Sequence, residues 1–176
     1  MIISFDIDGV LAEANYVGEV AWNDGGKEKF GANLLNLKPR FPKLISYINR
    51  LNRHHVVQIN SARCAEWWDD TRTWVDSVGI SPAIKINCLG EDKLMFLKML
   101  KPNLHFDDHP DYVQEEWGVH VWHPSWQDQP SAGMVSTAEE IIERIAYEKK
   151  SNKGTARSGS STAKHCYIGG YRSNKA

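Results

Sequence analysis

The sequence predicts an α/β fold built on an open, three-layer parallel sheet. Short apolar runs alternate with segments of helical periodicity along most of the 176 residues. The clearest apolar runs also end in polar side chains, namely Asp6 and Asp8, Ser61, and Asp107-Asp108. In open parallel sheets the carboxyl ends of the strands form a crevice in which ligands bind. The pattern therefore predicts that these polar side chains converge on one edge of the sheet.

Five strands and five helices are expected from the apolar runs and the helical periodicity. The strands are expected at roughly 2–6, 55–60, 83–87, 103–107 and 118–122. The helices are expected at roughly 40–53, 66–78, 91–100, 110–116 and 136–148. Ser136-Thr137-Ala138-Glu139 resembles a capping box, which predicts the start of the last helix.

Length and composition predict one soluble domain, at residues 1–148, with a sizeable core. Hydrophobic residues make up 41% of the chain, and no apolar run reaches the roughly 18 residues of a membrane span. The N-terminus enters the first strand without a basic segment, so no signal peptide is expected. Cys64, Cys88 and Cys166 lack metal-ligand spacing and fit a reducing compartment. A cytoplasmic location is therefore expected.

The C-terminal segment at residues 149–176 differs in charge from the rest of the chain. It holds seven Lys or Arg and no acid, whereas residues 1–148 hold 14 basic and 22 acidic residues. The segment is also rich in Ser and Gly, so we expect it to be disordered. It is either a solvated tail or a tether for the phosphates of nucleic acid.

Asp6 and Asp8 follow an apolar, β-prone run, and Gly9 then allows a sharp turn. Two carboxylates this close repel each other and are costly to desolvate, and a divalent cation relieves both problems. The alternative is a strand cap followed by an Asx-type turn. The other strand-end residues favour the metal site over the turn.

Four segments share a combined pattern: FDIDGVL, INSAR, EDKLMF and HFDDHPD. In order, they supply Asp-x-Asp, a strand-end Ser, a Lys and an acidic pair. This set, within residues 1–125, resembles the haloacid dehalogenase-like phosphohydrolase superfamily. The resemblance implies a Rossmann-like core and a Mg²⁺-dependent phosphomonoester hydrolase that works through an aspartyl-phosphate. It also implies a cap over the site at residues 12–36, here short enough to be a small flap.

The resemblance implies roles for the four strand-end carboxylates. Asp6 is expected to be the nucleophile, and Asp8 the general acid and then the general base. Mg²⁺ is expected to bind Asp6, the backbone carbonyl of Asp8, and the pair Asp107 and Asp108. Oxygen ligands of this kind suit Mg²⁺.

Three further residues are expected to bind the phosphate of the substrate. Ser61 is expected to donate a hydrogen bond to a phosphoryl oxygen, and Lys93 to supply positive charge. Lys85 is the alternative to Lys93. Arg63 is expected either to reach a phosphate or to form a surface ion pair with Glu66 or Asp69.

A finer resemblance concerns the substrate. Ser61-Ala62-Arg63, Thr71-Arg72-Thr73-Trp74-Val75 and Gly118-Val119-His120-Val121-Trp122 are similar to segments in the 3′-phosphatase domains of phage polynucleotide kinases. Ala62 departs from that pattern, and no kinase P-loop is present. The resemblance implies a nucleic-acid 3′-phosphate or a nucleotide as substrate. A small metabolite such as a sugar phosphate, or a non-catalytic binding module, is the alternative, and the oligomeric state is left open.

Histidine and tryptophan side chains offer two further interpretations. His105, His109, His120 and His123 lie near the acidic pair and could suggest zinc, although a structural role is favoured for His120. Tryptophans could stack on bases. Trp74 has the helical spacing of a core residue and is expected to be buried.

Overall fold

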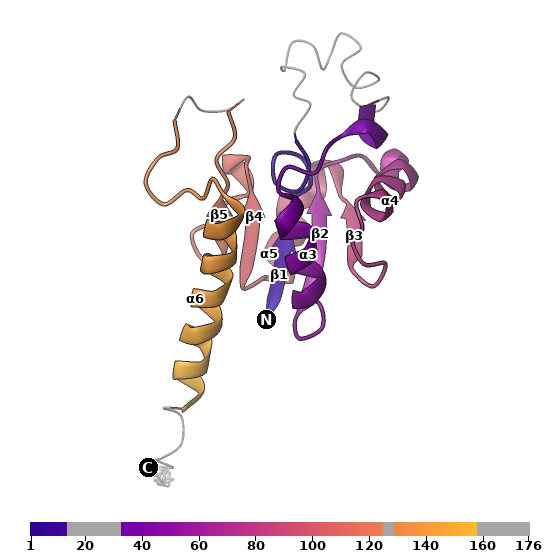
Figure 1. Cartoon of the computed structure of the whole chain (residues 1–176). Helices are drawn as coiled ribbons and strands as arrows, with labels where there is room; N and C mark the ends of the chain where they lie inside the picture. The colour runs from indigo at the N-terminus through magenta and orange to yellow at the C-terminus, as the bar shows by residue number, and fades with distance from the viewer. Residues whose placement is uncertain (14–32, 125–128, 158–176) are drawn as a thin grey trace, which may run out of the picture.

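The protein is described here by a computed structural model covering residues 1–13, 33–124 and 129–157. Within these residues, five parallel strands form one sheet in the order β3-β2-β1-β4-β5 (Figure 1). The strands are β1 (Ile2–Phe5), β2 (Val56–Ser61), β3 (Lys85–Cys88), β4 (Leu104–Asp107) and β5 (Gly118–His120). The sheet confirms the predicted open parallel α/β fold.

Helices cover both faces of this sheet. The α-helices are α3 (Pro42–Leu51), α4 (Trp68–Ser77), α5 (Lys93–Leu100) and α6 (Ala138–Arg157). Short 3₁₀ helices are η2 (Leu34–Asn36), η3 (Ala65–Trp67), η4 (Gly90–Asp92) and η5 (Pro110–Tyr112). Helices α3 and α6 lie in front of the sheet and α5 lies behind it, which gives three layers (Figure 1). In the part of the chain described, no helix has both the length and the apolar character needed to cross a membrane.

The strand register gives the sheet one apolar face and one polar face. Successive side chains of a strand point to opposite faces, so Ile3 and Phe5 share one face and Ser4 lies on the other. Phe5 pairs with Ile59 and Phe106, whereas Ser4 pairs with His105. The apolar face packs against α3, α4 and α6 in one core, whose members include Ile3, Phe5, Leu44, Ile48, Val57, Ile59, Trp74, Phe106, Ile141 and Ile145.

The predicted helix at 110–116 is wrong. Only η5 forms there, and Val113 already has extended backbone angles. The chain then turns so tightly that the Gly118 N–H donates to the carbonyl of Gln114 at 2.5 Å. A Cβ atom on Gly118 would lie 2.4 Å from the Gln114 nitrogen. The short return from β4 to β5 therefore leaves no room for a regular helix.

Helix α6 begins with the predicted kind of cap but ends later than predicted. Thr137 Oγ1 accepts from the Glu140 N–H at 3.2 Å, and Glu140 Oε2 accepts from the Thr137 N–H at 3.0 Å. This is a capping box shifted by one residue from the predicted position. Residues 149–157 continue the helix past its predicted end at 148, within the segment that the sequence predicted to be disordered. Ile141 and Ile145 are buried and hold the first turns of the helix in the core. Once these turns have formed, each further residue adds one backbone hydrogen bond, so the helix can extend beyond the core. Residues 158–176 lie outside the described part of the chain.

The predicted flap at 12–36 lies mostly outside the described residues, but both of its ends are described. Ala12 forms an antiparallel bridge with Pro39. The Glu13 N–H donates to Lys38 O and the Arg40 N–H donates to Leu11 O, both at 2.9 Å. The chain therefore leaves and returns at neighbouring positions, just beyond the carboxyl end of β1.

Candidate active site

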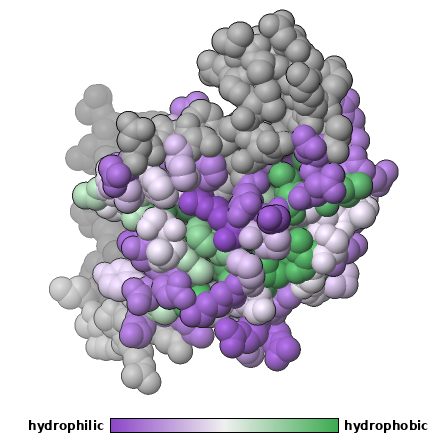
Figure 2. All heavy atoms as spheres, turned by 45° about the horizontal axis from the view of Figure 1, so that its top comes forward, coloured by the Kyte–Doolittle hydropathy of each residue, from purple (hydrophilic) through white to green (hydrophobic). Residues whose placement is uncertain are grey.

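Three buried carboxylates meet at the carboxyl edge of the sheet. Asp6 follows β1, Asp107 ends β4, and Asp108 comes next in the chain. Each offers an oxygen, and these oxygens lie within 4.8 Å of one another. The side chains are almost fully buried, with residue exposures of 6%, 0% and 1%. In Figure 2, which turns this edge toward the viewer, hydrophilic residues gather near the centre of the face. The cluster could hold a metal ion.

The turn after β1 brings these carboxylates together. The Asp6 N–H donates to Phe106 O at 2.9 Å, which extends the pairing of β1 with β4 by one residue. The carbonyl of Ile7 then accepts from Leu11 and Ala12, both at 2.8 Å, and closes a compact turn. Gly9 in this turn has φ +76°, and a Cβ there would lie 2.1 Å from Asp108 Oδ2. Glycine is therefore required both by the backbone conformation and by the close approach of Asp108.

Lys93 supplies a buried positive charge between two of the carboxylates. Its Nζ lies 2.8 Å from Asp6 Oδ1 and 2.6 Å from Asp107 Oδ2, and its side chain has no exposure. Burial lowers the pKa of Lys93, but Asp107 and Asp6 outweigh it and raise the pKa overall. Lys85 instead is exposed on β3. The structure thus places Lys93, and not Lys85, beside the carboxylates.

The buried carboxylates differ in how well their charges are compensated. Burial would raise the pKa of Asp107, but Lys93 and His105 lower it to about 2. Burial raises the pKa of Asp6 well above its usual value, and Lys93 only partly offsets the effect of burial and of the neighbouring carboxylates. The cluster therefore holds more negative charge than Lys93 neutralises. A divalent cation would remove this imbalance.

Arg63 holds the side chain of Asp8 in a two-point fork. Its Nε donates to Asp8 Oδ2 at 2.9 Å and its Nη2 donates to Oδ1 at 2.8 Å. Nη1 donates to Thr71 Oγ1 at 3.1 Å, and the guanidinium lies 5.8 Å from the centre of the Trp74 ring. Arg63 is only 2% exposed, so the alternative of a surface ion pair is wrong. The sequence did not predict that Arg63 would engage Asp8.

Ser61 lies at the same edge of the sheet, at the end of β2. It is 1% exposed, and its Oγ accepts from the Arg63 N–H at 3.2 Å. The Ser61 carbonyl accepts from the Leu89 N–H at 2.9 Å. Ser61 therefore fixes the turn that leads from β2 to Arg63.

The structure does not group the histidines into a metal site. Among the described residues, the three aspartates are the one group with close metal-ligating atoms. His120 is half-buried, and its Nε2 lies 2.9 Å from the carbonyl of Asp108. His105 is fully buried beside Asp107, with Nε2 2.8 Å from Asp107 Oδ2. A zinc site built from these histidines is not supported, and His120 has the structural role that the sequence favoured.

Sequence reasoning missed two residues that shape the site. Arg40 donates to the carbonyls of Gly9 and Trp122, and so ties the turn after Asp8 to the segment after β5. Helical periodicity does not mark Arg40, because Arg40 lies before the apolar residues that give the helix its period. His105 was noticed only as a possible zinc ligand. A better signal was the placement of polar Ser4 and His105 inside otherwise apolar strands.

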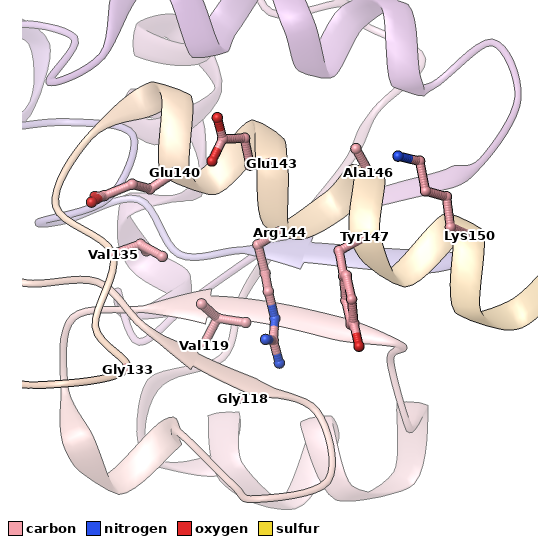
Figure 3. Close-up of a pocket in the computed structure, with 10 residues that line it drawn as sticks. All are labelled: Gly118, Val119, Gly133, Val135, Glu140, Glu143, Arg144, Ala146, Tyr147 and Lys150. Carbon is pink, nitrogen blue, oxygen red and sulfur yellow. The ribbon is translucent and has the colours of Figure 1, made fainter.

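The described residues also form a groove away from these carboxylates. It has a volume of about 730 Å³ and lies between β5 and α6. Arg144 and Tyr147 point from α6 toward the strand that carries Val119 (Figure 3). None of the predicted site residues lines this groove.

The fold and the site define an open parallel α/β protein whose sheet edge carries a buried carboxylate cluster fit for a metal ion. Comparison of the chain with protein-family models finds no match, and comparison with curated proteins finds none either. The geometry of the side chains must therefore carry the functional argument.

Proposed function

We propose that this protein is a Mg²⁺-dependent phosphomonoester hydrolase that works through an aspartyl-phosphate on Asp6. One observation carries the proposal: three buried carboxylates face a single buried Lys93 at the carboxyl edge of a parallel sheet. A site of this kind carries more negative charge than one lysine offsets, so a bound cation would stabilise it. It also has the nucleophile and the positive charge that phosphoryl transfer needs.

The residues fit Mg²⁺ better than a softer metal. The cluster offers only carboxylate oxygens, and Mg²⁺ prefers oxygen ligands. Asp6, Asp107 and Asp108 would hold the ion, with the backbone carbonyl of Asp8 as the further ligand that the sequence suggested. Bound Mg²⁺ would neutralise these carboxylates and favour the approach of a phosphate dianion.

In the first step, a carboxylate oxygen of Asp6 attacks phosphorus. The bond from phosphorus to the leaving oxygen breaks, and a proton from Asp8 goes to that oxygen. In the second step, Asp8 takes a proton from water, and the water oxygen attacks phosphorus. This attack releases inorganic phosphate and restores Asp6. Lys93 and the hydroxyl of Ser61 bind the phosphoryl oxygens as charge develops on them.

Arg63 holds Asp8 in place in this scheme. Both oxygens of Asp8 accept from Arg63. This geometry suits the second step, in which Asp8 acts as a base and neither of its oxygens carries a hydrogen at the outset. The first step needs a proton on Asp8, so one of the two bonds from Arg63 must open. Arg63 therefore acts through Asp8 in addition to any contact with substrate.

A nucleic-acid 3′-phosphate or a nucleotide is the proposed substrate class. The finer resemblance of the sequence suggests it, and one structural observation supports it. Trp68, at the start of the helix that follows Arg63, is 45% exposed, whereas Trp74 is fully buried in the core as predicted. An exposed ring five residues after Arg63 can stack on a base, and such stacking is worth about 1–3 kcal/mol per base.

A panel of phosphate-release assays tests the proposal. The full-length protein is given a 3′-phosphorylated oligonucleotide, nucleotides and hexose phosphates, each with Mg²⁺ and with excess EDTA. We expect Mg²⁺-dependent release, with the highest kcat/KM on the oligonucleotide or a nucleotide. Asp76→Asn, at a surface ion pair with Arg72, is the matched carboxylate control.

Two results would contradict the proposal at different levels. Full activity after exhaustive chelation would contradict the Mg²⁺-dependent mechanism. A higher kcat/KM on hexose phosphates than on every nucleotide would leave the mechanism in place and replace the substrate class.

A further inference from the structure

A row of buried polar side chains crosses the sheet from β3 to the carboxylate cluster. Asn87 Nδ2 donates to Asn60 Oδ1 at 2.6 Å, and Asn60 Nδ2 donates to Ser4 Oγ at 2.7 Å. Ser4 Oγ lies 2.8 Å from His105 Nδ1. His105 Nε2 lies 2.8 Å from Asp107 Oδ2. Strands β3, β2, β1 and β4 thus supply successive members of one hydrogen-bonded chain that ends at Asp107.

The direction of this chain is fixed at its Asp107 end. Lys93 Nζ lies 2.6 Å from Asp107 Oδ2, and the His109 N–H donates to Asp107 Oδ1 at 3.0 Å. An ammonium group and a backbone N–H are donors only, so both oxygens of Asp107 accept. His105 Nε2 must therefore carry a hydrogen and donate it to Asp107.

The donor-to-acceptor direction set at Asp107 holds for every hydrogen bond of the row. A neutral imidazole has one donor and one acceptor nitrogen, so His105 Nδ1 accepts from the hydroxyl of Ser4. The Ser4 oxygen in turn accepts from Asn60, as the amide geometry shows. The hydrogen of the Ser4 hydroxyl can then go to His105 Nδ1, 2.8 Å away, which needs that nitrogen to carry no hydrogen of its own. Every donor then points toward Asp107, and aligned hydrogen bonds strengthen one another.

The fold itself does not demand polar side chains at these positions. On the other face of the same strands, Ile3, Ile59 and Phe106 fill equivalent sites with apolar groups. Polar groups buried in a sheet are costly unless all their hydrogen bonds are made. A complete row that ends on a candidate metal ligand therefore points to a role at the site.

We propose that Ser4, Asn60 and His105 form a positioning chain that occupies Oδ2 of Asp107 and so directs Oδ1 toward a bound cation. An ionised carboxylate oxygen has about two acceptor positions. His105 takes one position of Oδ2, and Lys93 Nζ lies against the same oxygen as an ion pair at 2.6 Å. The His109 N–H takes one position of Oδ1 and leaves one for the cation. The cation part of the inference rests on the proposed function. The three residues are positioning residues, because they act through Asp107.

Nuclear magnetic resonance tests the chain without any activity measurement. Long-range ¹H–¹⁵N spectra of the full-length, metal-free protein report which ring nitrogen of each histidine carries the hydrogen. The signal that disappears in His105→Gln belongs to His105. We expect a single neutral tautomer with hydrogen on Nε2. In Ser4→Ala we expect the same tautomer with a shifted Nδ1 resonance, because Nδ1 loses its donor while Asp107 still holds the hydrogen on Nε2. Hydrogen on Nδ1, or a doubly protonated ring at neutral pH, would overturn the chain.

Calorimetric titration with Mg²⁺ tests the consequence for the site. We expect Ser4→Ala and Asn60→Ala to weaken Mg²⁺ binding by about 10-fold, since outer ligands of metal sites typically have effects of this size. Asn60→Ala breaks the chain at a residue that does not contact Asp107. It also provides a second variant if Ser4→Ala fails to fold. His105→Gln can still donate to Asp107 and accept from Ser4, and should bind Mg²⁺ most nearly like the wild type.

Asn49→Ala is the matched control. Asn49 bonds Gly79 O and the Ser81 N–H, away from the carboxylates, so its loss should lower Tm and leave Mg²⁺ affinity unchanged. Wild-type affinity in folded Ser4→Ala and Asn60→Ala proteins would overturn the inference and leave the proposed function standing. A wild-type protein that binds no Mg²⁺ would overturn the proposed function and the cation part of the inference, while the tautomer measurement still decides the chain.

Discussion

The two faces of the sheet are built from the same strands, yet they differ in chemistry. One face carries Ile3, Phe5 and Ile59 and joins the apolar core under α3, α4 and α6. The other face carries Ser4, Asn60 and His105 in a hydrogen-bonded row beside α5. Apolar packing is tolerant of exchange at constant volume, whereas a polar row requires defined partners at every step. We infer that the apolar face contributes stability alone, whereas the polar face also fixes the geometry of the site.

The largest expected effect is on turnover, through Asp6→Asn. This change keeps the shape of the side chain and removes the proposed nucleophile, so we expect phosphate release to fall by at least about 10³-fold. Burial and nearby carboxylates raise the pKa of Asp6, so its negative charge destabilises the metal-free fold. The metal-free variant should therefore have a Tm equal to or above that of the wild type. Activity that persists in a folded Asp6→Asn protein excludes the covalent mechanism.

Lys93→Met should separate the charge of the polar face from its packing. Lys93 is fully buried between Asp6 and Asp107, so removing its charge leaves two carboxylates without compensation. We expect the free energy of unfolding of the metal-free protein to fall by about 3–5 kcal/mol. Mg²⁺ should restore part of this loss, as measured by urea unfolding with and without the ion. A variant that is as stable as the wild type without Mg²⁺ would contradict this account.

Ile48→Ala is the corresponding change on the apolar face. Ile48 of α3 is fully buried in the core, and we expect its truncation to cost about 2–5 kcal/mol of unfolding free energy. Because Ile48 lies on the face away from the polar row, the Mg²⁺ affinity of the folded fraction should stay unchanged. A parallel loss of Mg²⁺ affinity would show that the two faces do not divide their tasks.

The smallest expected effect concerns pH and His123. Burial, aided by Arg40, lowers the pKa of His123 to about 4. An unfolded histidine titrates near pH 6.5, about where it does in model peptides. Between these values the unfolded chain binds more protons, so stability should fall as the pH falls from about 6.5 toward 4. His123→Gln should flatten this slope in urea unfolding series, and an unchanged slope would exclude His123 as its source.

The sequence predicted the parts of the fold that depend on local pattern. All five strands lie close to their predicted positions because their apolar runs end in polar residues. The helix expected at 110–116 failed because the return between β4 and β5 is short and brings Gly118 close to Gln114, which no local pattern encodes. The late end of α6 also lacked a signal, since no proline or early glycine marks a stop near 148.

The site was predictable as a set of residues but not as a set of contacts. Asp6, Lys93 and Asp107 meet because β1 lies between β2 and β4, an order that no local pattern encodes. For the same reason the fork between Arg63 and Asp8 was missed, since it joins residues 55 positions apart. The polar row from Asn87 to His105 depends on the register of four strands.

The two described ends of the segment after β1 lie next to each other, so the segment between them could be replaced as a unit. Ala12 and Pro39 lie side by side, so the chain between them begins and ends at one place on the scaffold. Doubling the length of such an insertion costs only about 0.6 kcal/mol in loop entropy. Evolution or an engineer could therefore exchange the chain between these two ends as a cassette, without rebuilding the sheet.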